Sequence, residues 1–351
     1  MARDGVDSGY HRHRMRSDLS LQMPEFNIVV PDMFALLEPL RDSDPRRAAR
    51  FAEIIGRADH AARGHDDECA EMLRLLGAES HPVVPMPPAS LTYAHDIGTE
   101  PETHVLRADP VHLRADPSRL VLFAPRHLEV TPTEGDQLIG ALNDVYAEQD
   151  LNFLRGASPE RWYIAGAGLP ELLAPSPSSL DGETLEPDRQ SRRQMGALQT
   201  IWTEIQMLFH DHPVNEARVG KHKPAINSVW FWGGGDVTIP RGLQNIAIAT
   251  DDDELWTAAA SCGVGQRVEL VALIEETAPA MVVLRNPDHA TCDQLCDALE
   301  NGLRRLRRGR IEAVTLSDRN QRFRLTNSNR WRVWRRASGF WAYRQPHLRE
   351  N

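Results

Sequence analysis

The densest group of side chains that could do chemistry lies between residues 204 and 218. It combines carboxylate, imidazole, amide and guanidinium groups: Glu204, Gln206, His210, His212, Asn215 and Arg218. Pro213 is expected to end the preceding helix near His210, which places both histidines at a helix C-terminus, where a cationic imidazole is favoured. Two interpretations follow. Glu204, His210 and His212 form a phosphate or metal site, or these groups cap the helix and fix the loop by hydrogen bonds.

A second candidate is the strand-like segment 226–232, which runs directly into Gly233, Gly234 and Gly235. Three successive glycines let backbone amides approach an anion, but they also permit a tight turn beneath bulky tryptophans. The segment matches neither the dinucleotide-binding fingerprint nor the P-loop. Asn227 and Trp232 join the glycines as ligand-binding candidates. We expect Asn227 and Asn215 to hold the glycine loop by hydrogen bonds, so that the glycines form the ligand-facing wall.

Other polar residues follow expected strands. Asp109 and His112 come at the end of a strand that begins at His104, and they form either a functional site or an Asp-Pro turn with a surface histidine. Asp32 follows the apolar run 26–30, and it is either a metal ligand or a helix cap. Because a functional site draws on separate parts of the chain, we expect Asp109 and His112 to lie near the 210–215 loop.

These residues must be positioned by an alternation of strands and helices. Buried strands are predicted at 26–30 and 281–284, further strands at 120–124, 161–165 and 226–232, and a hairpin around residues 318–320. Helices are predicted at 33–40, 46–57, 70–76 and 189–210. A further helix starts with the Thr131 cap, Pro132 and Glu134. The alternation favours an α/β fold with mixed α+β elements.

Composition excludes several classes of protein. The chain has 351 residues and is 41% hydrophobic, which is enough for a large core and too much for a disordered protein. It has no apolar run of about 18 residues, and its net charge of −10 argues against general nucleic-acid binding. Residues 1–23 form a polar extension, which we expect to be dispensable. The four cysteines show no metal-type spacing and favour the reducing cytoplasm.

Positive charge is concentrated near the C-terminus. Residues 303–336 contain twelve arginines and two acids, Glu312 and Asp318. The run from Arg304 to Arg310 is either a solvated helix end or a binding surface for a phosphate or an acidic partner.

The segments 204–215 and 226–235, together with Arg107–Leu113 and Trp331–Arg336, resemble bacterial proteins described as RpfE-type regulatory proteins. These are also described as predicted 2,3-bisphosphoglycerate-independent phosphoglycerate mutases. The resemblance covers about residues 26–336 and extends to archaeal-type mutases of the alkaline phosphatase superfamily. It implies an alkaline-phosphatase-like core, complete or reduced, with an inserted α/β domain. It also implies two divalent metals (Mn, Mg or Zn), with Asp32 as a ligand at the end of the first strand.

The sequence departs from this family at the positions that the chemistry needs. Ser43 and Ser80 are the only hydroxyl residues between Asp32 and the Pro-rich loop, and neither has the context of a nucleophile. Arg319 follows Asp318 where the superfamily has an Asp-His pair. The late metal-binding motif of the superfamily is absent, and its nearest match, residues 286–289, is a poor one.

Two functions therefore remain open: a catalytically degenerate regulatory or ligand-binding protein, or an active metal-dependent phosphoglycerate mutase. The predicted partners are a small phosphorylated or acidic metabolite or a protein, but neither nucleic acid nor a membrane. The predicted organisation is a core of residues 24–100 and 226–336, an insertion at 101–225 and a flexible tail at 337–351.

Overall fold

The computed structural model describes residues 25–332, apart from 64–66, 81–86, 117–118, 183–195, 197, 236, 241 and 275–279. The predicted extension 1–23 and tail 337–351 lie outside the described residues. The described chain divides into two compact units. Unit 1 comprises residues 78–239, and unit 2 comprises residues 25–77 and 240–332.

Unit 2 contains a seven-stranded mixed sheet. The first five strands in spatial order are parallel: β11 (Gln266–Arg267), β10 (Ala247–Thr250), β12 (Ala280–Val283), β1 (Phe26–Val29) and β13 (Ala313–Ser317). Two further strands complete the sheet: β14 (Gln321–Thr326) pairs antiparallel with β13, and β2 (Asp59–Ala62) pairs antiparallel with β14. The predicted first strand and the hairpin around residues 318–320 are confirmed. Strand β1 lies between β12 and β13, so the N-terminal segment supplies the middle of the sheet.

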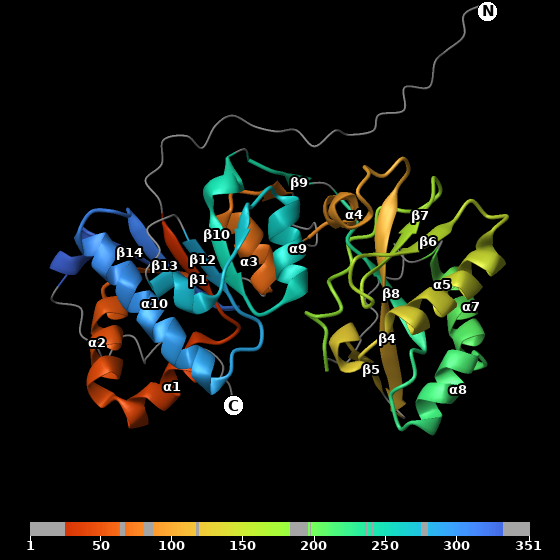
Figure 1. Cartoon of the computed structure of the whole chain (residues 1–351), viewed down its shortest axis with the longest axis horizontal. Helices are drawn as coiled ribbons and strands as arrows, with labels where there is room; N and C mark the ends of the chain where they lie inside the picture. The colour runs from red at the N-terminus through yellow and green to blue at the C-terminus, as the bar shows by residue number, and fades with distance from the viewer. Residues whose placement is uncertain are drawn as a thin grey trace, which may run out of the picture. The chain divides into compact units, whose positions relative to one another are not determined.

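Helices cover both faces of this sheet (Figure 1). Three belong to the apolar layer: α1 (Met33–Ser43), α2 (Pro45–Gly56) and α10 (His289–Arg307). The other face carries α3 (Glu68–Leu75) and α9 (Asp253–Ser261). Helix α10 packs so closely that a Cβ added to Gly302 would lie 2.5 Å from Cδ1 of Phe26. Short 3-10 turns complete the unit: η2 (Leu243–Asn245), η3 (Leu270–Ile274) and η4 (Asn329–Trp331).

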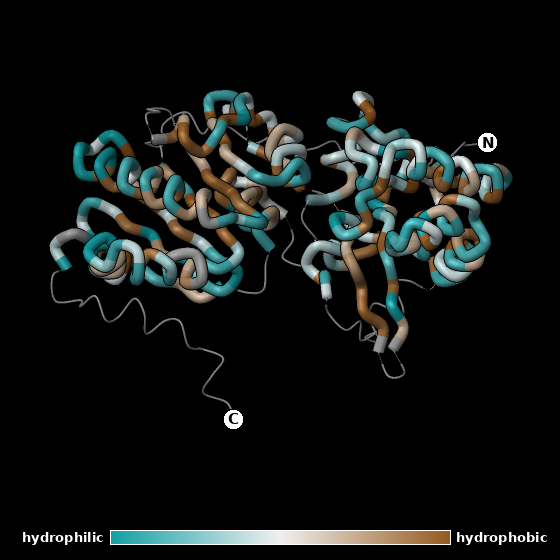
Figure 2. Tube along the Cα trace, turned by 60° about the horizontal axis from the view of Figure 1, so that its bottom comes forward, coloured by the Kyte–Doolittle hydropathy of each residue, from teal (hydrophilic) through white to brown (hydrophobic). Residues whose placement is uncertain are grey.

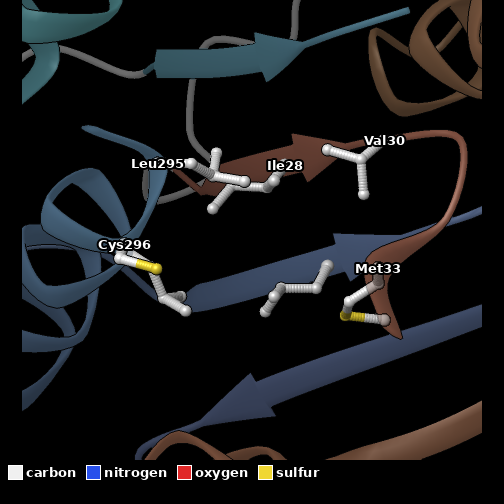
Figure 3. Close-up of a pocket in the computed structure, with 7 residues that line it drawn as sticks. Ile28, Val30, Met33, Leu295 and Cys296 are labelled. Carbon is white, nitrogen blue, oxygen red and sulfur yellow. The ribbon is translucent and has the colours of Figure 1, made fainter. Parts of the chain in front are cut away.

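A small gap remains in the apolar layer between β1, β13 and α10 (Figure 3). It has a volume of about 10 Å³ and is lined only by apolar side chains, among them Ile28, Met33, Leu295 and Cys296. A gap of this size and polarity is a packing defect and not a ligand site.

Unit 1 contains an antiparallel sheet built around one long strand, β4 (Val105–Asp116). Strand β4 pairs with β5 (Arg119–Phe123), β7 (Trp162–Ala165) and β8 (Ser228–Trp232), and β7 pairs with β6 (Asn152–Arg155). The flanking helices are α4 (Ala89–Ile97), α5 (Pro132–Tyr146), α7 (Leu198–His210), α8 (Pro213–Gly220) and the 3-10 turn η1 (Pro125–His127). In both units hydrophobic residues gather in the strands and hydrophilic residues lie on the outer helices (Figure 2).

The predicted mixed α/β class is confirmed, and the start of α5 has the predicted capping box between Thr131 and Glu134. The predicted turn at Asp109-Pro110 is wrong. Strand β4 runs straight through it, because Asp109 and Val111 on either side of Pro110 both pair with β8.

The boundaries of unit 1 also differ from the predicted insertion 101–225. Helix α4 belongs to unit 1 because Tyr93 packs edge-on against Tyr163, and β8 belongs to it because it pairs with β4. A two-stranded ladder of β3 (Glu79–Ser80) and β9 (Val237–Thr238) joins the two ends of the unit.

None of the helices in the described ranges is both long enough and apolar enough to cross a membrane.

Candidate functional site

Charged residues follow four parallel strands of unit 2. Asp32 comes after β1, Asp251 and Asp252 after β10, Arg285 after β12, and Asp318 after β13. Because parallel strands end at the same edge of a sheet, these side chains share the edge where α/β proteins place functional groups. We call this region the carboxyl edge of unit 2.

Arg285 is the central cation of the carboxyl edge. Its side chain is 6% exposed, and its Nη1 donates to Asp252 Oδ2 at 3.0 Å and to Glu254 Oε2 at 3.1 Å. Its Nε lies 3.9 Å from Glu68 Oε2. Burial by itself would lower the pKa of Arg285, but the charges of Glu254, Asp252 and Asp67 outweigh burial and raise it. The guanidinium is therefore a permanent positive charge among carboxylates.

Helix α3 brings two more buried acids to this region, and arginines bind both. Glu68 Oε1 accepts from Arg319 Nε at 2.9 Å. Glu71, whose side chain is fully buried, accepts Arg322 Nε at 2.8 Å and Arg322 Nη2 at 2.6 Å, and Arg63 Nη2 lies 3.0 Å away. Burial would raise the pKa of Glu71, but the hydrogen bonds and nearby arginine charges lower it, so the acid stays ionised.

The remaining carboxylates of the carboxyl edge bind backbone amides. Asp251 uses its two oxygens for the amides of Arg285 and Asn286, each at 2.8 Å. Asp318 Oδ1 accepts the amides of Asn320 and Gln321 at 2.9 and 2.8 Å. Burial raises the pKa of Asp318, and the nearby charge of Asp32 contributes to the rise.

A pair of divalent metals does not fit this arrangement. Metal sites need several carboxylate or imidazole groups whose free lone pairs converge on one point. Here Asp251 is committed to amides, while Glu68 and Glu71 are committed to arginines. Within the described ranges, no three or more His, Cys, Asp or Glu side chains are arranged to hold a metal ion. Arginines hold the positive charge at this edge instead.

Ser43, Ser80 and Cys69, the hydroxyl and thiol residues between positions 32 and 81, do not have the position or reactivity of a phosphoryl acceptor. Ser43 lies at the exposed end of α1, where its hydroxyl donates to Pro39 O at 3.1 Å. Ser80 lies in β3, which belongs to unit 1. Cys69, in the first turn of α3, is 1% exposed, and burial raises its pKa far above the usual value, so it remains an unreactive thiol.

The predicted metal ligands Asp32, His210 and His212 are divided between the two units. Asp32 belongs to unit 2, where its Oδ1 accepts the amide of Phe34 at 2.9 Å, as expected for a helix cap. The histidines belong to unit 1. His210 is exposed, whereas His212 caps α8 by accepting the amide of Val214 on Nδ1 at 3.2 Å. Burial lowers the pKa of His212 and keeps Nδ1 available for this bond.

Unit 1 contains a buried ion pair on β4 at the predicted Asp109 position. Asp109 binds Arg107 through both oxygens, at 2.8–3.0 Å. It also accepts the amide of Trp162 at 3.1 Å and Nε1 of Trp232 at 2.7 Å. The Arg107 guanidinium lies 4.8 Å from the centre of the Trp232 ring. Both oxygens of Asp109 accept hydrogen bonds inside the sheet, so Asp109 and Trp232 stabilise the unit.

The other polar candidates of unit 1 also bind the backbone. Asn215 donates to Phe209 O and Ile226 O and accepts the amide of Ile226. Asn227 exchanges two hydrogen bonds with the backbone of Leu113, at 2.8 Å each. Both amides are architectural, as predicted, but they hold the start of β8 and not the glycine loop.

Of the two residues expected near the 210–215 loop, Asp109 and His112, the contacts place His112 there. His112 Nδ1 binds Ala225 O at 2.8 Å, and Asn215 binds the next residue, Ile226. Buried Arg218 binds Pro224 O and Glu134. These bonds join β4, α5 and α8 around the segment that leads into β8.

The remaining two candidates lie on α7. Glu204 is exposed and accepts the hydroxyl of Tyr146 at 2.9 Å. Gln206 is half-buried on the same helix.

The glycines pack against other backbone segments. A Cβ on Gly234 would lie 2.5 Å from Leu172 O, and a Cβ on Gly233 would lie 3.1 Å from Ala89 N. Gly233 also accepts the amide of Ala89 at 2.7 Å, and Gly234 donates to Leu172 O at 3.0 Å. Gly233 has φ +78° and Gly235 has φ +100°. Gly233 and Gly234 are thus buried by neighbouring chain and do not form a wall open to a ligand.

Arg285, Glu68 and Glu71 are site residues that were not predicted from the sequence. A signal existed, because Arg285 follows a predicted buried strand and acidic residues follow the strand at 247–250.

The fold defines a two-unit α/β protein. No protein-family model matches the chain, and no curated protein matches it. Similar solved structures include the PH0037 protein from Pyrococcus horikoshii, with a TM-score of 0.49, 11% identity and coverage of 90% of this chain and 91% of that chain. A cofactor-independent phosphoglycerate mutase from Thermoplasma acidophilum has a TM-score of 0.40 and 15% identity, with coverage of 87% and 90%.

Proposed function

We propose that this protein is a phosphoglycerate-mutase-like protein of the RpfE type that no longer carries out metal-dependent phosphoryl transfer. On this proposal it has a regulatory or ligand-binding role, with a small phosphorylated or acidic metabolite or a protein as partner. The observation that carries the proposal is the binding of Arg285 to Asp252, Glu254 and Glu68. A guanidinium supplies fixed charge and hydrogen bonds, but it cannot activate a nucleophile as a metal does.

The chemistry of the neighbouring residues supports the same proposal. Transfer through a phosphoenzyme needs an accessible nucleophile near the charged groups. At the start of α3 the side chains are the arginine-bound Glu68 and the buried thiol Cys69. All four cysteines are free, which fits a reducing compartment, and we propose the cytoplasm as the location.

Two measurements on the purified full-length protein test the proposal. The first is interconversion of 3-phosphoglycerate and 2-phosphoglycerate with Mn²⁺, Mg²⁺ or Zn²⁺, using an archaeal-type mutase as a positive control. The second is calorimetric titration with the same metals. We expect no turnover above the blank and no pair of tight metal sites. Turnover together with two tight sites would instead establish an active metal-dependent mutase.

A further inference from the structure

A hollow of about 230 Å³ lies on the surface of unit 2 between α2 and α10. Its lining consists of Arg50 from α2 and of Glu300, Leu303, Arg304 and Arg307 from α10. It lies on the outer surface of the apolar helix layer, and none of the residues at the carboxyl edge lines it.

Three of the five lining residues are exposed arginines. Within the described ranges, Arg50, Arg304 and Arg307 have no ion-pair partner. The one acid of the lining, Glu300, already accepts Arg47 Nε at 3.1 Å. The hollow therefore has an excess of positive charge, although the chain as a whole has a net charge of −10.

The helix dipole explains only part of this pattern. Arg304 and Arg307 lie in the last turn of α10, where positive side chains interact favourably with the helix C-terminus. Arg50 lies in the middle of α2 and gains nothing from the dipole of α10. Bringing its charge next to two others costs electrostatic energy unless an anion is bound.

The two helices that carry the arginines are fixed relative to each other. Arg47 of α2 binds both Asp297 and Glu300 of α10. Phe51 and Ile55 of α2 share the apolar core with Leu299 and Leu303 of α10. The arginines therefore extend from a rigid base, which reduces the entropy lost when a ligand binds.

We propose that this hollow binds the phosphate group of a small molecule. A phosphate has three terminal oxygens and takes hydrogen bonds from several guanidinium groups, whereas a carboxylate has two oxygens and is saturated by fewer. Leu303, which is 5% exposed and belongs to the apolar core, lies at the base of the hollow. This site is independent of the carboxyl edge and does not depend on whether the protein is a mutase.

Calorimetric titration of the full-length protein with inorganic phosphate and with glycerol 3-phosphate tests the proposal, with glycerol as the phosphate-free probe. We expect both phosphates to bind and glycerol not to bind. The phosphate that binds more tightly identifies the ligand as the free ion or as an ester. Absence of binding by both phosphates at millimolar concentration would overturn the proposal.

Variants of the lining residues test whether phosphate binds in this hollow. Each of Arg50→Gln, Arg304→Gln and Arg307→Gln should weaken phosphate binding about tenfold, because each removes a charge-assisted hydrogen bond. Glu300→Gln should strengthen it about threefold by removing a nearby negative charge. The matched control is Arg308→Gln with Arg310→Gln, which removes two exposed charges just beyond the end of α10. An equal loss in this control would show diffuse attraction and no defined site.

Discussion

Arg285 is a buried guanidinium at the carboxyl edge that contacts Asp252 and Glu254 at 3.0 and 3.1 Å. Removing one partner of a buried ion pair leaves the other charges without compensation, and this costs more than the pair itself contributes. Arg285 therefore compensates the negative charges of Asp252 and Glu254 at the start of α9.

Arg285→Met should lower the free energy of unfolding at pH 7 by about 3–5 kcal/mol. Chemical denaturation of the variant and the wild type measures this difference. The deficit should shrink at acidic pH, because burial raises the pKa of Asp252 and protonation of this acid removes one of the uncompensated charges. The control is Arg267→Met, which breaks an exposed ion pair with Asp253 and should cost less than about 1 kcal/mol. Equal losses in the two variants would contradict this role of Arg285.

His212 makes the stability of unit 1 depend on pH. Its Nδ1 accepts the Val214 amide only when that nitrogen is unprotonated, and burial lowers the pKa from 6.5. A lowered pKa means that the unfolded chain takes up the proton first. The contribution of His212 is therefore present above pH 6.5 and is lost as the pH falls through the lower folded pKa.

Replacement of His212 by Asn keeps a side chain that caps helices well but does not titrate. Between pH 7 and pH 5, the melting temperature of this variant should fall less than that of the wild type. The difference between the two changes in melting temperature gives the contribution of His212 alone, because both proteins contain the other histidines. Parallel slopes would exclude the cap as a titrating group.

Among the elements, those defined by local sequence were the most predictable. Strand β1 and helix α5 occur as predicted, because a β-branched apolar run and a capping box act over a few residues. The prediction of a turn at Asp109-Pro110 was wrong, because the extended conformation of β4 is set by its pairing with β8, a strand distant in sequence. The ion pairs near the carboxyl edge were not predicted for the same reason, because they join residues that are distant in sequence. Arg322 and Glu71, for example, are 251 residues apart.

The glycine segment after β8 was assigned a ligand-facing role that the structure does not support. Gly234→Ala should destabilise the protein by about 1–3 kcal/mol, because the new Cβ would lie 2.5 Å from Leu172 O, a backbone atom that cannot move independently. Gly140→Ala is the control. Gly140 lies on the exposed side of α5 with nothing within 4 Å of its Cβ position, so alanine should stabilise the helix by about 0.5–1 kcal/mol. Thermal unfolding of both variants should give shifts of opposite sign, and a neutral Gly234→Ala would mean that the β8 loop is free to move.

For the whole molecule, the two units differ in how the chain builds them. Unit 1 is a continuous segment, whereas unit 2 needs two segments because β1 lies between β12 and β13. Ion pairs such as Arg319 with Glu68 connect the same two segments of unit 2. Unit 1 should therefore fold from its own continuous segment, whereas unit 2 should fold only when its N-terminal strand β1 is present.

A fragment of residues 78–239 should fold alone and unfold cooperatively. Its ends are held together because Glu79 pairs with Thr238 and Ser80 pairs with Val237, and its core includes the fully buried Trp162 and Trp232. Circular dichroism and thermal unfolding measure this outcome. Residues 240–332 alone should remain unfolded without β1, whereas residues 25–77 joined to 240–332 by a short Gly-Ser linker should fold. An unfolded 78–239 fragment would show that unit 1 depends on the rest of the chain, and a folded 240–332 fragment would show that its sheet does not need the central strand.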